Sequence, residues 1–580
     1  MLQQIFHIIF ISTCCIIWGV PALLYVHKNK QESFLKQLMP GTLLFMFFSG
    51  LMTLSIFCAL ICIFFPLNFQ SLLISTSCLF FYLLIFQRKN INETGRNISF
   101  KSHLSIFEFF FICISLLVFI LLGTLKTVNS DTHIYHTQII LWFNEYGAVP
   151  GIANLFPRFG LGSNWLNLTS LFRLPFFGHE NFSYLNSTLV IWVFLWLFFK
   201  WKQHSKNYSA NAASKTMSLF YLLILLFCLY EWELFRDAAN SANYDFIVTA
   251  LHIIIVSFLI ENILFNNDKK HFSILFVVLC LSIIPIKLSG IFILLPLSFY
   301  FLYSFSKKNL FLTFCAALVI LIPLFIRNYI ISGYPLFPLS FGFSSPDWQL
   351  PAAMADHIKQ YILVTNRFYN SELDFTKIPE QLNKPWVWSW FNGIRLQHKI
   401  LFAASFSSLA LFFAKTKHEL DFKKLRILFF LFLLMEAGWF LTAPSPRFGY
   451  GILLIVALFP ICLFAAGKIP LMAPKFLLVL TMVFSCYYLY KKWTPFFENK
   501  NLLIYPDVFD LPPVKIINIK GTSFYFPEKN NTDYIRSCYH TTLPCICQEN
   551  KYLEPRGKSL KDGFRMNSKP DSIFIKNYTY

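Results

Sequence analysis

Apolar runs long enough to cross a membrane recur along this chain of 580 residues. A helix needs about 20 consecutive apolar residues to span a bilayer. Only 13% of the residues are charged, whereas a soluble chain carries about a quarter. We therefore predict an all-α polytopic membrane protein. About fourteen transmembrane helices are expected, near 3–27, 41–65, 67–87, 105–125, 183–200, 217–234, 245–263, 272–286, 288–305, 309–330, 399–414, 426–442, 449–467 and 475–491.

The positive charges indicate an orientation for these helices. Lys and Arg gather in short loops at 28–40, 87–103, 200–216, 264–271, 305–309, 415–426 and 467–475. Such loops face the cytoplasm in polytopic proteins. The alternate loops, which include the long ones at 126–182 and 331–398, then lie on the other side together with both termini. Because topology accounts for the net charge of +20, we expect no nucleic-acid partner.

Three regions follow from this pattern. Residues 1–104 hold N-terminal transmembrane helices, 105–491 form the transmembrane core, and the polar segment 492–580 reads as a small extracytoplasmic C-terminal domain, α/β or mostly β. Strand-like runs in that domain are Val514–Ile519, Ser523–Phe526 and Ser572–Ile575. In the first long loop, Thr132–Tyr146 has helical spacing and is predicted to lie along the membrane surface, with Asn164–Phe172 as a second such helix.

Three cysteines stand in the polar C-terminal region. Cys538, Cys545 and Cys547 have no histidine pair nearby, which makes them a poor zinc site. An extracytoplasmic location favours a disulfide instead. We predict that Cys538 pairs with Cys545.

A polar island directly follows the apolar run 105–125. It places Asp131, His133 and His136 within about two helical turns. Asp131 is either the N-cap of the helix that follows or a carboxylate that takes a proton from an attacking nucleophile. His133 and His136 would orient it or help to hold a divalent metal ion. The sequence leaves a divalent metal open as a cofactor, with Asp131 as a ligand. No HxxxH or HExxH spacing is present to indicate such a site more strongly.

Further ionisable residues stand at the non-cytoplasmic ends of other helices. Asp245 begins one of them and reads as an N-cap or as a second functional carboxylate. The cations Lys287, Arg327, Arg447 and Arg158 lie on the same predicted side. They either reach toward lipid headgroups or bind a phosphate, for which the arginine fork is suited.

Several segments resemble known membrane proteins. A helix followed by an acidic residue and a large outer loop resembles the GT-C superfamily of integral-membrane glycosyltransferases. The segments at 131–160, 327–338, 445–451 and 538–564 resemble a group of uncharacterised bacterial multi-pass proteins. The superfamily resemblance implies a polyprenyl-phosphate sugar donor and an acidic residue in the first outer loop, here Asp131. A DxD motif is absent because His133 stands where the second acid would be.

The resemblance implies a glycosyltransferase of the bacterial inner membrane. It would move a sugar from a lipid-linked donor to an extracytoplasmic glycan, lipid or protein, with Asp131 as general base or metal ligand and Asp245, His133 and His136 assisting. Arg327, Arg447, Lys287 and Arg158 would hold the donor phosphate. Two alternatives stay open. One is a transporter, flippase or polymerase of lipid-linked glycans, and the other is a non-catalytic scaffold.

Overall fold

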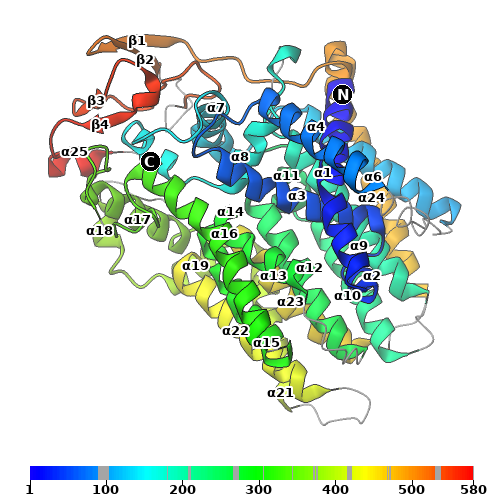
Figure 1. Cartoon of the computed structure of the whole chain (residues 1–580). Helices are drawn as coiled ribbons and strands as arrows, with labels where there is room; N and C mark the ends of the chain where they lie inside the picture. The colour runs from blue at the N-terminus through cyan, green and yellow to red at the C-terminus, as the bar shows by residue number, and fades with distance from the viewer. Residues whose placement is uncertain are drawn as a thin grey trace.

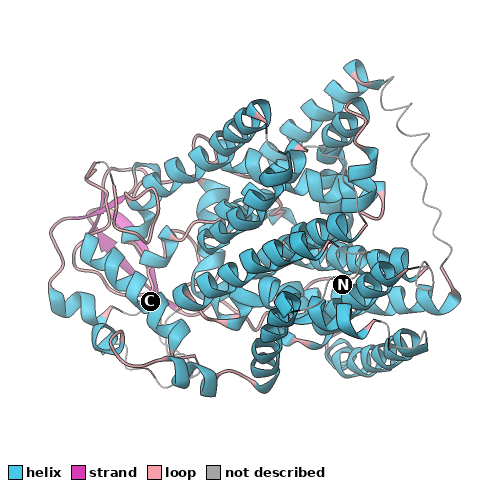
Figure 2. Cartoon of the chain, turned by 90° about the horizontal axis from the view of Figure 1, so that it is seen from below, coloured by secondary structure: helices cyan, strands magenta, loops and turns pink. Residues whose placement is uncertain are grey.

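The structure is a computed structural model of the chain. It describes residues 1–88, 104–178, 181–206, 211–265, 273–304, 306–342, 344–369, 373, 377–413, 421–466, 468, 472–528 and 537–578. Helices make up most of the molecule, and the few strands lie together at one end (Figures 1 and 2).

Long helices occupy the first half of the chain in the order that the apolar runs predict. Short and π-helical turns lie between them. The α-helices are α1 (Leu2–Lys28), α2 (Glu32–Leu38), α3 (Thr42–Ile61), α4 (Phe69–Phe86), α6 (Ile106–Thr124), α7 (Thr137–Glu145), α8 (Asn164–Leu171), α9 (Tyr184–Ser205), α10 (Ala212–Tyr230), α11 (Asp237–Ala239), α12 (Asp245–Leu264), α13 (Ile274–Leu281) and α14 (Ile283–Ile286).

The second half adds further long helices and the C-terminal region. Its elements are α15 (Leu294–Ser304), α16 (Lys307–Ser332), α17 (Ala352–Arg367), α18 (Ile378–Gln381), α19 (Val387–Gly393), α20 (Leu396–Ser405), α21 (Ala410–Phe413), α22 (Phe422–Thr442), α23 (Pro446–Ala465), α24 (Met472–Glu498), β1 (Val514–Ile519), β2 (Thr522–Pro527), β3 (Leu553–Pro555), β4 (Phe564–Met566) and α25 (Ser572–Asn577).

Many of these helices are long and apolar enough to cross a membrane. Within the described residues, 11 helical segments meet this criterion, and two shorter apolar ones run over Ile274–Ile286 and Leu288–Leu302. Helices therefore occupy the apolar runs, which confirms a helical, multi-pass type of chain. The last predicted crossing, 475–491, lies within α24. The total of about fourteen crossings stays a prediction.

Close packing of α1 on α3 depends on glycine. A Cβ atom at Gly50 would lie 1.7 Å from the Cys15 carbonyl oxygen, and one at Gly19 would lie 1.9 Å from that of Met46. Real side chains do not fit at such distances, so the two backbones touch only because both positions are glycine. Small residues allow membrane helices to approach in the same way.

The segment 132–146 is not an exposed surface helix. Thr132–His136 forms a π-helical turn that continues into α7, and the side chains of α7 from Thr137 to Asn144 are buried. The apolar side packs into the core. The polar side faces protein rather than water, because Gln138 donates to the carbonyl oxygens of Tyr539 and Thr541. The second predicted surface helix is likewise the buried α8.

The C-terminal region contains two small antiparallel sheets. Strands β1 and β2 form a hairpin whose turn residues Lys520 and Gly521 both have positive φ, as a tight hairpin turn requires. Strands β3 and β4 form the second sheet. The strand predicted at Ser572–Ile575 is wrong. These residues start helix α25, because the Asp571 carboxylate accepts the backbone N–H of Phe574 and caps it.

The C-terminal region docks on both long loops of the core. Phe564 donates its backbone N–H to the Pro150 carbonyl oxygen, and Asp347 accepts from Arg556 and Arg565. A disulfide joins Cys538 to Cys545, the predicted pair. It holds the segment that carries Tyr539, whose N–H donates to the His133 carbonyl oxygen. The docked region therefore covers the polar island.

Candidate functional site

A cavity of about 970 Å³, lined by many ionisable side chains among apolar ones, lies where the two long loops, the helix ends and the C-terminal region meet. Its walls come from segments far apart in the sequence. They include the polar island, the turn after α10, the ends of α12, α14 and α23, helix α17 and two residues of the C-terminal region. The ionisable residues that line it are Asp131, His133, Tyr135, His136, Arg158, Glu233, Asp237, Tyr244, Asp245, Lys287, Tyr361, Tyr369, Arg395, Arg447 and Tyr539.

Asp131 is held by two arginines. Its Oδ1 accepts from Arg158 over 3.2 Å and its Oδ2 from Arg447 over 2.9 Å. The side chain caps no helix, which rules out the N-cap interpretation. Burial alone would raise the pKa of Asp131, but the charges of Arg447 and Arg158 outweigh it and hold that pKa below its usual range. The carboxylate therefore stays ionised and is a weak proton acceptor.

Asp245 is the second carboxylate of the cavity that pairs with cations. Its side chain makes no N-cap bond. It accepts from Lys287, and its Oδ2 lies 3.5 Å from Nε of Arg447. Arg447 thus bridges the two acids. Lys287 also lies over the ring of Phe448, 3.0 Å from its centroid. Burial lowers the pKa of Lys287 to about 8, against the opposing effect of Asp245.

Asp237 differs from both of these acids because amides, not cations, hold it. Asn129 donates to its two oxygens over 3.3 and 3.0 Å, and Asn243 donates over 3.5 Å. Within the described part of the chain, no ion pair reaches Asp237. Burial raises its pKa to about 6, although these amides and Arg447 oppose the shift. It is the carboxylate of the cavity best suited to exchange a proton near neutral pH.

The two histidines line the cavity in different ways. His133 packs against the rings of Phe509 and Tyr539, with centroids 4.0 and 5.0 Å away. His136 is 1% exposed, and neither ring nitrogen has a hydrogen-bond partner among the described residues. Burial lowers the pKa of each to about 4. Both rings are therefore neutral at pH 7, and His136 has two nitrogens free to bind a ligand.

Arg327 does not line the cavity, so the structure does not place it with the other predicted phosphate-binding cations. The side chain is fully buried. It donates to Asn164 over 2.6 Å, to the Gly162 carbonyl oxygen over 2.9 Å and to Asn328. These bonds tie α16 to the first long loop. A cation at a helix end gives the same sequence signal whether it points into a cavity or into the protein, which is why the sequence could not separate Arg327 from Arg447.

Three important cavity residues escaped the sequence analysis. Glu233, Asp237 and Arg395 line the cavity, and the sequence assigned a role to none of them. The one available signal was the cluster of acids in the segment 231–237, directly after an apolar run. Arg395 lies directly before α20, more than 150 residues later, and no local pattern connects it to that cluster.

Comparison with known proteins identifies a family but does not indicate a function. A family model described as a domain of unknown function, DUF8201, matches residues 1–454. The chain belongs to the DUF8201 family. The match covers most of the core of this DUF8201 protein, ends within α23, and includes every cavity residue up to Phe448, but not the C-terminal region. No curated protein and no solved structure matches the chain.

Proposed function

We propose that this DUF8201 protein is a membrane glycosyltransferase of the GT-C type. It transfers a sugar from a polyprenyl-phosphate donor to an extracytoplasmic glycan, lipid or protein. One observation carries the proposal: acids and cations from separate segments converge on a single cavity at the end of an apolar helix bundle. Ionisable groups brought together at such a place usually serve a function, and a cavity of this kind is the default binding site.

The cations suit a phosphate leaving group. Arg447, Arg158 and Lys287 present N–H donors on one wall, and the two arginines offer forked donors that match phosphate oxygens. In the structure they pair with Asp131 and Asp245. These acids hold the cations in position before substrate arrives, and the donor phosphate then accepts from N–H groups of Arg447 and Lys287. Positioned cations stabilise the charge that develops on the leaving phosphate.

Asp237 is the better general base. A base has to accept the acceptor hydroxyl proton, and it does so best when its pKa lies near the working pH. Asp131 is too strongly stabilised as an anion by its two arginines. Asp237 has no such partner and lines the same cavity. We therefore assign proton transfer to Asp237 and give Asp131 the role of positioning Arg158 and Arg447.

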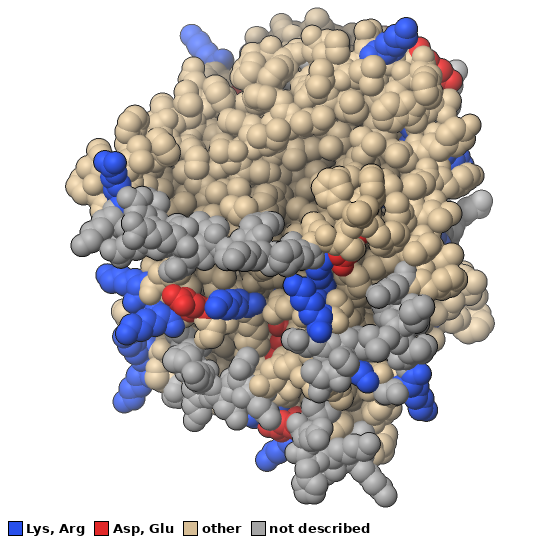
Figure 3. All heavy atoms as spheres, turned by 90° about the vertical axis from the view of Figure 1, so that its right-hand side faces the viewer, with Lys and Arg blue, Asp and Glu red and all other residues tan. Residues whose placement is uncertain are grey.

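The charge distribution supports the proposed orientation in the inner membrane. Figure 3 shows Lys and Arg gathered across the lower half of one side, and an area almost without charged side chains above them. That arrangement fits basic cytoplasmic loops next to a lipid-facing surface. The cavity, the C-terminal region and both termini would then lie on the extracytoplasmic side.

Transfer activity of the purified protein tests the proposal. The protein is reconstituted into liposomes with a panel of radiolabelled polyprenyl-phosphate sugars, and membranes from cells that lack the gene supply the acceptors. We expect loss of label from one donor and its appearance in an acceptor. Asp131→Asn and Asp237→Asn should each lower the transfer rate about a hundredfold or more. Glu436→Gln, which changes a buried glutamate outside the cavity, is the control. Full activity of both cavity variants would contradict the proposal.

One observation favours a second candidate, a transporter or flippase. Helix α12 carries Asp245 at one end and Glu261 about 24 Å further along. Glu261 accepts from Lys200, His204 and Tyr221, and the Lys200 and Glu261 side chains are 1% and 2% exposed. Buried charges inside a helix bundle are typical of transport paths. Movement of a lipid-linked glycan across the liposome membrane without a covalent product would favour this function.

A further inference from the structure

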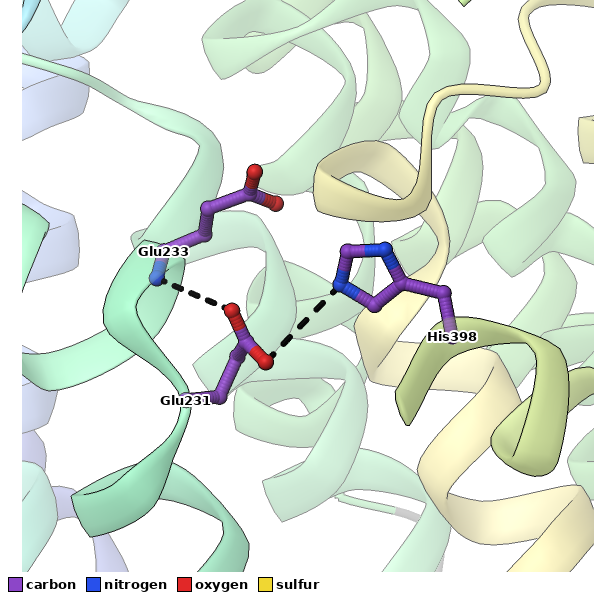
Figure 4. A group of neighbouring side chains, drawn as sticks. All are labelled: Glu231, Glu233 and His398. Atoms are coloured by element: carbon purple, nitrogen blue, oxygen red, sulfur yellow. Dashed lines mark hydrogen bonds and ion pairs between the residues drawn. The ribbon is translucent and has the colours of Figure 1, made fainter. Parts of the chain in front are cut away.

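Two glutamates and a histidine form a separate cluster beside the cavity. Glu231 and Glu233 flank the start of the π-helical turn that follows α10, and His398 lies in the first turn of α20. Figure 4 shows the three side chains converging on a common point from these two elements. One ligand atom from each residue lies within 4.8 Å of the others. Glu233 also lines the cavity, so the cluster borders it.

The hydrogen-bond donors and acceptors of the cluster do not match one another. The Tyr450 hydroxyl lies 2.7 Å from Nε2 of His398 and 3.0 Å from Oε2 of Glu233, and it has one proton to donate. The other ring nitrogen of His398 is buried with no partner among the described residues. Either tautomer of the imidazole therefore leaves one group unsatisfied. When Nε2 donates to the Tyr450 hydroxyl and that hydroxyl donates to Glu233, Nδ1 is the nitrogen left unsatisfied. A ligand on Nε2 would take the place of Tyr450 and move the ring proton to Nδ1.

The charges of the cluster do not balance either. The Glu231 and Glu233 side chains are 3% and 14% exposed. The nearest arginine, Arg395, lies 3.7 and 3.8 Å from them, beyond hydrogen-bond distance, and is 45% exposed. Tyr369 and Gln397 donate neutral hydrogen bonds to the two carboxylates. One solvated cation thus faces one buried and one partly buried carboxylate, and buried charge is costly unless it is fully paired or coordinates a metal.

We propose that Glu231, Glu233 and His398 bind a divalent cation of the Mn²⁺ or Zn²⁺ class. Carboxylates favour Mn²⁺, imidazole favours Zn²⁺, and both ions accept the mixed set. At metal–ligand distances of about 2.1 Å, the ligand atoms of a tetrahedral ion lie about 3.4 Å apart, so the three side chains would each move by about 1 Å to close the site. Tyr450 then donates to Glu233 alone. The site differs from the metal position expected at Asp131, and it stands whether or not the cavity transfers sugars.

Titration of the purified protein with Mn²⁺ tests the site. The protein in detergent is treated with chelator and dialysed at pH 7, and the electron paramagnetic resonance signal of free Mn²⁺ is followed. We expect one site per chain that Zn²⁺ empties by competition. Glu233→Gln and His398→Gln should each weaken binding about tenfold or more. Glu233→Gln keeps the shape of the side chain and an oxygen that accepts from Tyr369, so we expect it to fold.

Matched variants locate the ion. Glu436→Gln removes another buried glutamate and should leave the affinity unchanged. Asp131→Asn should also bind normally, and if it alone abolishes binding, the ion lies at Asp131 and the inference is wrong. Arg395→Gln changes a half-exposed residue and should tighten binding, because it removes a competing positive charge. Absence of binding up to about 1 mM Mn²⁺, or unchanged affinity in Glu233→Gln, would overturn the site without touching the proposed transfer reaction.

Discussion

Arg447 donates a 2.9 Å hydrogen bond to Asp131, although 316 positions of sequence separate the two residues. The pair joins the start of α23 to the polar island that follows α6. It fixes the cavity from both sides, because Arg447 also reaches Asp245. Breaking a partly buried ion pair is costly, since the remaining charge loses its partner and is only partly solvated.

Asp131→Asn should therefore destabilise the fold as well as impair the site. It leaves Arg158 and Arg447 without an anionic partner at that position. We expect a loss of about 1–3 kcal/mol for this partly exposed pair, measured as a lower melting temperature in detergent. The double variant Asp131→Asn with Arg447→Gln should lose less than the sum of the two single variants. Asp356→Asn, at an exposed aspartate paired only weakly with Lys359, is the control. Additive losses would show that the pair does not act as a unit.

Asp237→Asn should stabilise the protein at neutral pH while it removes activity. Because the pKa of Asp237 is raised to about 6, the folded state binds more protons than the unfolded state between about pH 4 and pH 6. Ionisation therefore costs stability as the pH rises through that window. The neutral amide avoids this cost, up to about 3 kcal/mol above pH 6, and the melting temperature should rise at pH 7.5 but not at pH 4.

The pH dependence of the transfer rate tests whether Asp237 is the general base. Activity of the unchanged protein should rise with pH through about 6 and then level off, because only the ionised carboxylate accepts a proton. Arg447 favours the ionised form and Glu233 opposes it. Asp237→Asn should lose about 10²–10⁴ in rate, and its remaining rate should no longer depend on pH in that window. An unchanged profile would remove Asp237 as the base.

Arg327 gives a contrasting prediction. Its three acceptors come from the first long loop and from the neighbouring Asn328. Arg327→Lys supplies one ammonium in place of the planar fork and should lower the melting temperature by leaving buried acceptors unsatisfied. The affinity for the lipid-linked donor should stay unchanged in the folded fraction. Arg447→Lys should show the reverse. The affinity for the lipid-linked donor should fall, and the melting temperature should fall less than in Arg327→Lys. Equal donor affinities in the two variants would contradict this distinction.

The sequence predicted the helices well because hydropathy decides whether a segment crosses a bilayer. It also placed Asp131, Asp245, Lys287, Arg158 and Arg447 at the same end of the bundle, since topology alone fixes the side on which a helix end lies. Which way a side chain points is a tertiary property, and Arg327 was misplaced for that reason. The buried α7 was misread as a surface helix because its polar residues contact the C-terminal region rather than water. The strand predicted at Ser572–Ile575 failed because the cap from Asp571 outweighed β propensity.

The C-terminal cysteines give a prediction about both folding and topology. The Cys538 sulfur is bonded to Cys545 and also lies 3.5 Å from the sulfur of Cys547. Cys545→Ser should therefore yield a Cys538–Cys547 disulfide, whereas Cys538→Ser should leave both other thiols reduced. Mass spectrometry of alkylated, non-reduced protein distinguishes the two outcomes. Because disulfides persist outside the cytosol, recovery of the Cys538–Cys545 bond from membranes alkylated at once would support an extracytoplasmic C-terminal region. Three reduced thiols in such membranes would contradict that orientation, and with it the side proposed for the cavity.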